Sequence, residues 1–411
     1  MSEPEIRPIA DDELEPWVRA VESSFGGVFK QDYLDLERMV ARPERYLAAF
    51  DGERIVGGNA SIPVDLTVIG GARIDACGIN AVGVTPGETR RGISTALMRR
   101  QLDDARERGE AVAILHASEA AIYGRYGFGI ATRNASLHVD VTEGRFVRGY
   151  EARGRVRLTD RDEGLAAYVA ARRAELDRPG CLGPIDRYAD WFLRDMELND
   201  DDVSDPKAEP PFVAVHETSG RVDGVAIYRI KHGWPDSTPR NKVILYDVAA
   251  ATAEAYADLW RFVLDLDLVA SVERWSVALD EPLFRLVREP RALRMKVRDG
   301  MFVAFVDLAA ALTARRYTGS GTLRLRVHDA FSEANDGTWE LEVDDGMASC
   351  RRTAAEPHVS LTATDLAATY LGDVTFAELA SALRAEGDAD AIARADALTA
   401  SHRVPWSWLL V

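Results

Sequence analysis

The stretch "NAVGVTPGETRRGISTALM", Asn80 to Met98, passes from an alternating apolar run through a short polar loop into an amphipathic run. The first part predicts a strand, and the apolar spacing from Ile93 onward predicts a helix opened by Arg90-Arg91-Gly92. The first turn of a helix leaves backbone N–H groups unpaired and carries the positive dipole end, so it binds a pyrophosphate well. Gly92 permits close approach of the phosphate, and the arginines add charge-assisted contacts. The competing interpretation is an ordinary helix start with solvent-exposed arginines.

The flanking segments place this window inside a strand-rich unit. Strand-like runs cover residues 46–50, 54–69 and 73–86. Gly70-Gly71, between the last two runs, is a good hairpin signal. The helix is expected to end at Gly109, and the apolar run 111–115 reads as a buried strand. The predicted order is antiparallel sheet, helix and buried strand.

A polar connection, residues 143–155, leads into a second unit that repeats the order of hairpin, strand and helix. The repeated order indicates an internal duplication with divergent sequence. Helices are expected at 164–178 and 253–267, and strands at 211–217, 221–230 and 242–251. No Arg-Arg-Gly stands between the last strand and its helix, so this unit is expected to lack a pyrophosphate site.

The rest of the chain forms a third unit, which begins near Met301 with strand-like runs and ends in an alanine-rich helical stretch before "RVPWSWLLV". A chain of 411 residues suggests two or three domains. The layout predicts a mixed α/β (α+β) fold with domains at residues 1–145, 146–298 and 299–411.

Composition narrows the classes of function. The formal net charge of −17 argues against nucleic-acid binding and favours solubility or the attraction of cationic ligands. The cysteines form no CxxC pair and the histidines no HxxH or HExxH pair, so we expect no disulfide framework and no metal site. The N-terminus has no apolar h-region, and no run of about 18 apolar residues occurs. We therefore expect a cytoplasmic protein without membrane association.

Two other phosphate-binding motifs can be tested directly. No GxxxxGK[ST] occurs, which excludes a P-loop. Residues Gly124 to Gly129 read GxxGxG, the reverse of the dinucleotide fingerprint, and an extended rather than helical segment follows. This glycine-rich segment is therefore not a Rossmann loop.

The motif Val82-x-Val84-x-Pro86, then Arg90-Arg91-Gly92, a helix, a strand and "IYGRYGFG", resembles the acetyl-CoA core of the GNAT N-acetyltransferases. Thr89 and Ser94 depart from the family's loop, [Q/R]xxGx[G/A]. The run "LHASEAAIYGRYGFGIAT", the chain length and the three-unit layout resemble the enhanced intracellular survival (Eis) acetyltransferases over essentially the whole chain. The resemblance implies a GNAT domain, a second GNAT-like domain without cofactor and a C-terminal domain similar to sterol carrier protein. It also implies acetyl-CoA as donor and a homo-hexamer.

The resemblance assigns roles to individual residues. It implies that Tyr123, the first tyrosine of "IYGR", is the general acid and that the α-carboxylate of Val411 is the general base. The residues expected to bind the cofactor are Val82, Gly83, Val84, Arg90, Arg91, Gly92, Ile93, Ser94, Thr95, Ser118 and Glu119.

Most of these assignments have a structural alternative. Tyr123 would otherwise be a packed aromatic, as we expect Tyr126 and Phe128 to be. Ser118 is expected to cap the short helix that follows, and contact with the pantetheine arm of the cofactor is equally open. The apolar ending "PWSWLLV" fits a terminus held in a pocket or a tail docked on its own domain. His116 invites a base assignment but is expected to be a strand-end residue.

The leading hypothesis is an acetyl-CoA-dependent N-acetyltransferase that acts on primary amines of cationic acceptors, namely aminoglycosides, polyamines or lysine side chains, by direct attack on the thioester. One alternative is a lipid- or sterol-binding module with a degenerate GNAT unit. The presence of both Arg-Arg-Gly and Tyr123 favours the enzyme. The other alternative is an acyltransferase that uses a longer acyl-CoA.

Overall fold

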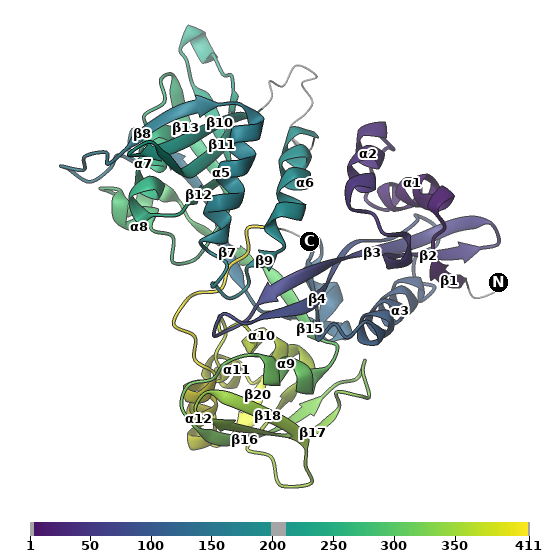
Figure 1. Cartoon of the computed structure of the whole chain (residues 1–411). Helices are drawn as coiled ribbons and strands as arrows, with labels where there is room; N and C mark the ends of the chain where they lie inside the picture. Colours follow the sequence, from purple (N-terminus) through teal and green to yellow (C-terminus); the bar gives the residue numbers. More distant parts are fainter. Residues whose placement is uncertain (1–3, 199–210, 410–411) are drawn as a thin grey trace. The chain divides into compact units, whose positions relative to one another are not determined.

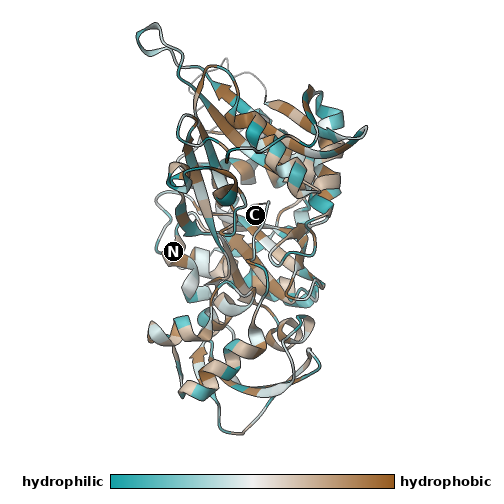
Figure 2. Cartoon of the chain, turned by 90° about the vertical axis from the view of Figure 1, so that its left-hand side faces the viewer, coloured by the Kyte–Doolittle hydropathy of each residue, from teal (hydrophilic) through white to brown (hydrophobic). Residues whose placement is uncertain are grey.

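A computed structural model describes residues 4–198 and 211–409 of the chain (Figure 1). The described chain divides into two compact units. The first comprises Met1–Thr132, Arg178–Leu182 and Asp299–Val411, and the second comprises Arg133–Asp177 and Gly183–Arg298. The short strand β9 (Leu182–Gly183) spans the sequence boundary between the two units. In Figure 2 the strands of the sheets carry much of the strongly hydrophobic sequence.

The N-terminal sheet of the first unit has the strand order β1-β2-β3-β4-β5-β15-β6. Its strands are β1 (Glu5–Pro8), β2 (Tyr46–Asp51), β3 (Arg54–Thr67), β4 (Arg73–Val84), β5 (Val112–His116), β15 (Met301–Phe305) and β6 (Gly129–Ile130). The accompanying helices are α1 (Leu14–Ser24), α2 (Gln31–Val40), α3 (Ile93–Glu107) and α4 (Ala120–Tyr123). Neighbouring strands run antiparallel except β4 and β5, which are parallel.

Helices cover both faces of this sheet, which explains the continuous apolar run in β2. Alternate residues of a strand point to opposite faces. Tyr46, Ala48 and Phe50 pack in one cluster with Trp17 of α1, whereas Leu47 and Ala49 pack in another cluster with residues of α3. All five of these β2 residues are buried. The predicted strands, hairpin and helix are confirmed.

Strand β15 belongs to the N-terminal sheet although it follows the second unit in sequence. It pairs antiparallel with β5, with Met301 opposite His116, and on its other side with β6. Figure 1 shows β15 beside the purple and blue strands. The chain therefore leaves this sheet after β6 and returns to fill the position between β5 and β6. We keep the domain boundaries at 145/146 and 298/299 as a proposal. Two strands lie in the sheet of another proposed domain: β15 (Met301–Phe305) pairs in the N-terminal sheet, and β7 (Arg133–Asp140) pairs in the sheet of the second unit.

The C-terminal part of the first unit has its own sheet, in the order β18-β17-β16-β19-β20. Its strands are β16 (Gly321–His328), β17 (Gly337–Asp344), β18 (Met347–Arg352), β19 (Val359–Thr362) and β20 (Ala385–Gly387). The helices are α9 (Leu308–Ala314), α10 (Ala363–Thr369), α11 (Phe376–Ser381) and α12 (Ala389–Thr399). Buried side chains of β16 and β17 alternate with more exposed ones, as expected for a sheet that buries one face.

The second unit is built on a sheet with the order β14-β7-β13-β12-β11-β10-β8. Its strands are β7 (Arg133–Asp140), β8 (Arg155–Thr159), β10 (Phe212–Thr218), β11 (Arg221–Lys231), β12 (Asn241–Ala250), β13 (Val269–Val277) and β14 (Lys296–Asp299). Its helices are α5 (Arg161–Arg173), α6 (Ile185–Leu198), α7 (Ala253–Leu264) and α8 (Leu283–Leu286). The series β11, β12, α7, β13 repeats β3, β4, α3, β5, with an antiparallel pair followed by a parallel one. The predicted internal repeat is therefore present.

Within the described residues, no helix is both long enough and apolar enough to cross a membrane.

Candidate active site

The centre of the candidate site is the point where β4 and β5 separate. The two parallel strands pair only over Ala76–Gly78 of β4, although β4 continues to Val84 and β5 to His116. An extra residue disturbs the β3–β4 ladder between Asn80 and Gly83, and Ala81 there has a φ of 51°. Such a β-bulge bends its strand and increases the local twist. The bend leaves the β5-facing edge of residues 82–84 open, as the predicted backbone contacts to a cofactor require.

Two buried polar atoms near this opening support a ligand site. Within the described residues, Asn80 Oδ1 and Thr85 Oγ1 are buried and make no hydrogen bond. Most buried polar side-chain atoms in proteins have a partner, so an unpaired pair beside an open strand edge fits a site that a polar ligand fills. Gly83 lies between them, where the Cβ of any other residue would sit 1.9 Å from Ser24 Oγ of α1. Glycine here lets the end of α1 pack closely against the open part of β4.

The loop after β4 delivers the chain to the start of α3 as the sequence predicts. Gly92 is the N-cap of α3, with a φ of 80°, and a Cβ at this position would meet nothing within 4 Å. Glycine adopts this left-handed conformation without strain. The N–H groups of Ile93, Ser94 and Thr95 lie in the first turn and have no intrahelical acceptor. No side chain caps these groups, so the start of α3 can accept a pyrophosphate.

The two arginines of the loop have different surroundings. Arg91 donates to Glu88 and lies 3.6 Å from Asp51, so acidic side chains already balance its charge. Hydrogen bonds from Arg54 and Arg91 hold the pKa of the Glu88 carboxyl below its ordinary value. Arg90 is exposed, has a φ of 65°, and has no carboxylate within ion-pair distance among the described residues. Arg90 is thus the better placed of the two to meet a phosphate, whereas Arg91 braces the loop.

Tyr123 ends α4, just after β5, and is half-buried in an aromatic group. Its ring centroid lies 6.5 Å from that of Tyr126, 6.0 Å from that of Phe128 and 6.4 Å from that of Phe302 on β15. Burial, with smaller contributions from Tyr126 and Glu119, raises the pKa of the Tyr123 phenol above its ordinary value. Because its pKa is raised, the phenol is protonated at neutral pH. Its hydroxyl makes no hydrogen bond to the described residues, so its proton is available for donation.

Tyr126 has a part that the sequence did not reveal. Its hydroxyl lies 3.2 Å from Ser94 Oγ and 3.4 Å from Thr95 Oγ1, in the first turn of α3, and its ring is buried. The expectation of a packed aromatic is therefore incomplete, because Tyr126 also joins the "IYGR" segment to the first turn of α3. The signal available in the sequence was the spacing of two tyrosines three residues apart on a helical turn.

The residues between β5 and α4 are placed differently from the prediction. Helix α4 starts at Ala120, and its N-cap is Glu119, whose side chain makes no capping hydrogen bond. The prediction that Ser118 caps this helix is wrong, because the chain stays extended through Glu119. Both residues are exposed at the end of β5. Their contact with a cofactor stays a prediction.

The C-terminal segment is anchored up to its last described residue. Hydrogen bonds join Arg178 Nε to Val404 O at 2.8 Å, Trp406 N to Pro179 O at 2.9 Å, and Trp408 Nε1 to Leu182 O at 3.0 Å. The 178–182 segment is itself bonded to Thr67 of β3. Leu409 is fully buried. Val411, the proposed base, lies outside the described residues, and its role stays a prediction.

Two of the three cysteines have thiols whose pKa is raised. Burial raises the pKa of the Cys77 thiol to about 11 and that of Cys350 to about 12, so both are protonated at neutral pH. Across residues 4–198 and 211–409, no three His, Cys, Asp or Glu side chains gather into a group that could hold a metal ion.

The second unit has the same strand separation but different residues in it. β12 has an extra residue between Leu245 and Asp247, and its pairing with β13 ends at Ile244. Asp247, just beyond, is buried and bonded to Arg172, to Arg274 at 2.7 Å and to Tyr168 at 2.7 Å. Helix α7 is capped by the side chain of Thr252 and has Glu254 in its first turn. At the start of α7, the described part of this unit thus has a capped N–H group and an acidic side chain, where α3 has an uncapped first turn.

Known protein families match all three parts of the chain. An acetyltransferase (GNAT) domain family matches residues 5–131, a second GNAT domain family matches residues 183–306, and a sterol carrier protein domain family matches residues 308–408. A Streptomyces avermitilis protein named an uncharacterized N-acetyltransferase is 34% identical over 98% of both chains. N-acetyltransferase Eis of Mycobacterium tuberculosis is 32% identical over 85% of this chain and 84% of its own. The crystal structure of Eis1 from Mycobacterium abscessus covers 99% of this chain and 100% of its own, with 31% identity and a TM-score of 0.84.

Fold, site and matches define the class of protein: an N-acetyltransferase with two tandem GNAT domains and a C-terminal sterol carrier protein domain, which takes its acyl group from an acyl-CoA. The predicted fold class and enzyme class are confirmed. The chain belongs to the Eis family of N-acetyltransferases. The alternative of a binding module that has lost its enzyme activity is therefore set aside.

Proposed function

We propose that this enzyme transfers the acetyl group of acetyl-CoA to primary amines of cationic acceptors, by direct attack of the amine on the thioester. One observation carries the proposal. In the first unit, the open edge of β4 leads to the uncapped start of α3, and a protonated tyrosine ends α4, the helix that follows the neighbouring strand β5. Cys77 and Cys350 are both protonated at neutral pH, so neither is an activated nucleophile, which favours direct attack over an acyl intermediate on either of these thiols.

The open part of the sheet would hold the donor through main-chain groups. Backbone groups of Val82, Gly83 and Val84 are available to the pantetheine amides because β4 has left β5. The N–H groups of Ile93, Ser94 and Thr95 and the side chain of Arg90 would take the pyrophosphate, with Arg91 and Gly92 shaping the loop. Ser118 and Glu119 lie at the end of β5, on the opposite side of the strand opening. Acetyl-CoA supplies the thioester when it is bound.

Tyr123 is proposed to protonate the departing thiolate. A general acid must be protonated before transfer and able to reach the leaving group. Burial raises the pKa of this phenol, so it is protonated throughout the neutral range, and its hydroxyl is not held by another described residue. Tyr126, whose hydroxyl is bonded in the first turn of α3, is less suited to this role.

The base proposed is the α-carboxylate of Val411. A free alkylamine has a pKa near ~10.4, so on the order of one molecule in a thousand is neutral at neutral pH, and a base must take the proton. The chain is buried and bonded as far as Leu409, in the same unit as Tyr123. Two further residues extend at most about 7 Å. The fixed segment therefore restricts where the terminal carboxylate can act.

The acceptors proposed are aminoglycosides, polyamines or lysine side chains, since a net charge of −17 attracts cations. The resemblance to the Eis family also supports a homo-hexamer as the assembly.

A thiol-release assay tests this proposal. Wild type should release CoA from acetyl-CoA in the presence of at least one amine of a panel that includes an aminoglycoside, a polyamine and a lysine peptide. A chain that lacks Leu410 and Val411 should lose most of this activity and keep its affinity for acetyl-CoA. If CoA is released from a longer acyl-CoA but not from acetyl-CoA, the donor is the longer acyl-CoA and the proposal of acetyl-CoA is wrong. Full activity of the truncated chain would refute the carboxylate base.

A further inference from the structure

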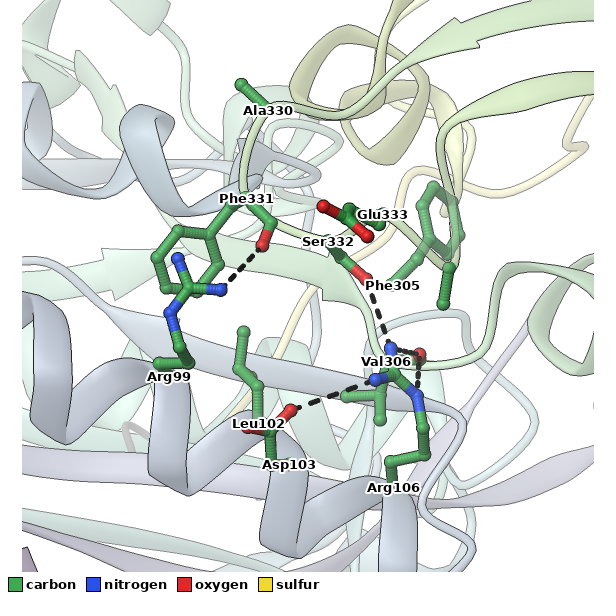
Figure 3. Close-up of a pocket in the computed structure, with 11 residues that line it drawn as sticks. Arg99, Leu102, Asp103, Arg106, Phe305, Val306, Ala330, Phe331, Ser332 and Glu333 are labelled. Carbon is green, nitrogen blue, oxygen red and sulfur yellow. Dashed lines mark hydrogen bonds and ion pairs between the residues drawn. The ribbon is translucent and has the colours of Figure 1, made fainter.

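A polar pocket lies between α3 and the loop of residues 329–336 in the C-terminal part of the first unit. It encloses about 330 Å³. Figure 3 shows Arg99 and Arg106 of α3 directed at this loop, with Phe331 and Ser332 opposite them. Arg106 donates to Val306 O at 2.7 Å and to Ser332 Oγ at 3.1 Å. The proposed chemistry at β4, β5 and Tyr123 leaves this pocket without a role.

The pocket continues the face of α3 that starts at the phosphate-binding turn. Residues three or four apart lie on the same side of a helix, so Thr95, Arg99 and Arg106 share one face. Tyr126 joins the two ends of this path, because its hydroxyl contacts Thr95 and its ring lies 5.1 Å from that of Phe331. Helical side chains also lean toward the N-terminus of their helix. Arg99 thus lies one turn beyond Thr95, on the face of α3 that starts at the turn proposed to hold the pyrophosphate.

Arg99 differs from its neighbours in its charge balance. Arg91 pairs with Glu88, Arg100 with Asp104, and Arg106 with Asp103. Within the described part of the chain no carboxylate pairs with Arg99. Its guanidinium lies 4.5 Å from the ring centroid of Phe331 and donates to the Phe331 carbonyl at 3.2 Å, which leaves its other N–H groups available.

The loop that holds Arg99 is internally fixed. Asp329 accepts hydrogen bonds from the N–H groups of Phe331 and Ser332, both at 2.9 Å. Asn335 anchors the far end of the loop by donating to Phe305 O at 2.8 Å. A guanidinium held over an aromatic ring by a rigid loop is positioned in advance for an anionic group.

We propose that Arg99, positioned by Phe331 of the C-terminal domain, binds the 3′-phosphate of the CoA ribose. The inference rests on the proposed function, since it takes the pyrophosphate to lie on the first turn of α3. A phosphate monoester presents several acceptor oxygens, which a guanidinium binds by charge-assisted hydrogen bonds. The sterol carrier protein domain thus contributes to recognition of the donor, and Arg99 distinguishes CoA from dephospho-CoA.

Calorimetric titration of the full chain with CoA and with dephospho-CoA, without any amine, tests this inference. Wild type should bind CoA about tenfold more tightly than dephospho-CoA. Arg99→Gln should bring the two affinities within about twofold of each other by weakening CoA alone, and Arg99→Lys should restore part of the preference. The matched control is Arg100→Gln, the next residue on α3, which pairs with Asp104 and should keep the wild-type preference.

The outcomes separate the two proposals. If CoA binds to wild type without preference over dephospho-CoA, or if Arg99→Gln keeps the preference, the inference is wrong and the proposed function stands. If Arg99→Gln weakens both ligands equally, Arg99 acts on the fold or the pyrophosphate and not on the 3′-phosphate. If neither ligand binds to wild type, the proposed function fails and the inference fails with it.

Discussion

The N-terminal sheet and the sheet of the second unit share a topology. Each contains two parallel strands that pair over part of their length and then separate, and the two sheets differ in the residues found where the strands separate. In the first unit, β4 and β5 part beside an uncapped helix start, and Asn80 and Thr85 present unpaired buried oxygens. In the second unit, β12 and β13 part beside a helix in which the Thr252 side chain accepts a hydrogen bond from the N–H group of Ala255. The separation there is next to the buried ion pairs of Asp247.

On the proposed function, a few residues decide whether this fold binds an anion. Glycine at the cap of α3 leaves the N–H groups open, whereas threonine at the cap of α7 consumes one of them. Glu254 in the first turn of α7 would repel a phosphate, and the helix after β13, with sequence LFRL, has no tyrosine. The strand geometry is therefore a shared framework, and the chemistry lies in the residues placed on it.

The largest effect is expected from Tyr123→Phe. Loss of a general acid should lower kcat by about a hundred- to ten-thousand-fold, because the thiolate then leaves without a proton donor. The affinity for acetyl-CoA should stay unchanged. Steady-state kinetics and calorimetry check the two expectations, and Tyr126→Phe serves as control, with kcat near wild type and a moderate rise in the KM for acetyl-CoA. A Tyr123→Phe variant with wild-type kcat would show that Tyr123 is not the general acid, and the tyrosine would no longer distinguish the two units.

The next effect concerns the stability of the second unit. Burial opposes ionisation of Asp247, but Arg172 and Arg274 outweigh it and lower its pKa, so the carboxylate is charged. Asp247→Asn would leave two buried guanidinium groups with less compensation, and removing one partner of a buried pair typically costs about 3–5 kcal/mol. Urea unfolding followed by fluorescence measures this change. Asp265→Asn, at an exposed pair with Arg261, should cost less than about 1 kcal/mol. If the free energy of unfolding falls by a similar amount in both variants, the buried ion pairs of Asp247 do not stabilise the second unit more than an exposed pair does.

A smaller effect is expected from exchanging the residue at the second position of each helix. Ser94→Glu places in α3 the acidic residue that α7 carries as Glu254. The added carboxylate should raise the Kd of acetyl-CoA by about tenfold through repulsion of the pyrophosphate. The matched variant Glu254→Ser should leave the Kd unchanged. Calorimetry reads both, and a larger response to Glu254→Ser than to Ser94→Glu would reverse the assignment of the two units.

The smallest effect is one of pH. Tyr123 is proposed to act in its protonated form, and burial raises its pKa above 10.0, so this form persists as pH rises and is lost only above that value. The rate should therefore not fall between pH 7 and about pH 10 on account of this group. A pH profile of kcat measures this. An alkaline decrease with a midpoint near pH 8 that disappears in Tyr123→Phe would contradict the assignment.

Local patterns in the sequence predicted much of this molecule. Hydrophobic alternation and the glycine signals identified the hairpin before α3 and the start of α3 after Arg90-Arg91-Gly92, because these features depend on neighbouring residues. The return of β15 to the N-terminal sheet was not predicted, since pairing between Met301 and His116 joins residues far apart in sequence. The cap of α4 was misplaced by one residue for a local reason, as the chain stays extended through Glu119.

The parts of the site that join distant segments were also missed. Tyr126 reaches the first turn of α3 through its hydroxyl, and Phe331 meets both Tyr126 and Arg99 from the C-terminal domain. Each of these residues reads as an ordinary aromatic in its own segment. Their roles depend on contacts that a linear pattern does not contain.

A crystal structure of the chain with CoA bound tests the central claim most directly. The account predicts one CoA per chain, with its pyrophosphate on the N–H groups of Ile93–Thr95 and its pantetheine along residues 82–84 of β4. A pyrophosphate on the first turn of α7, or one that does not contact α3, would contradict it.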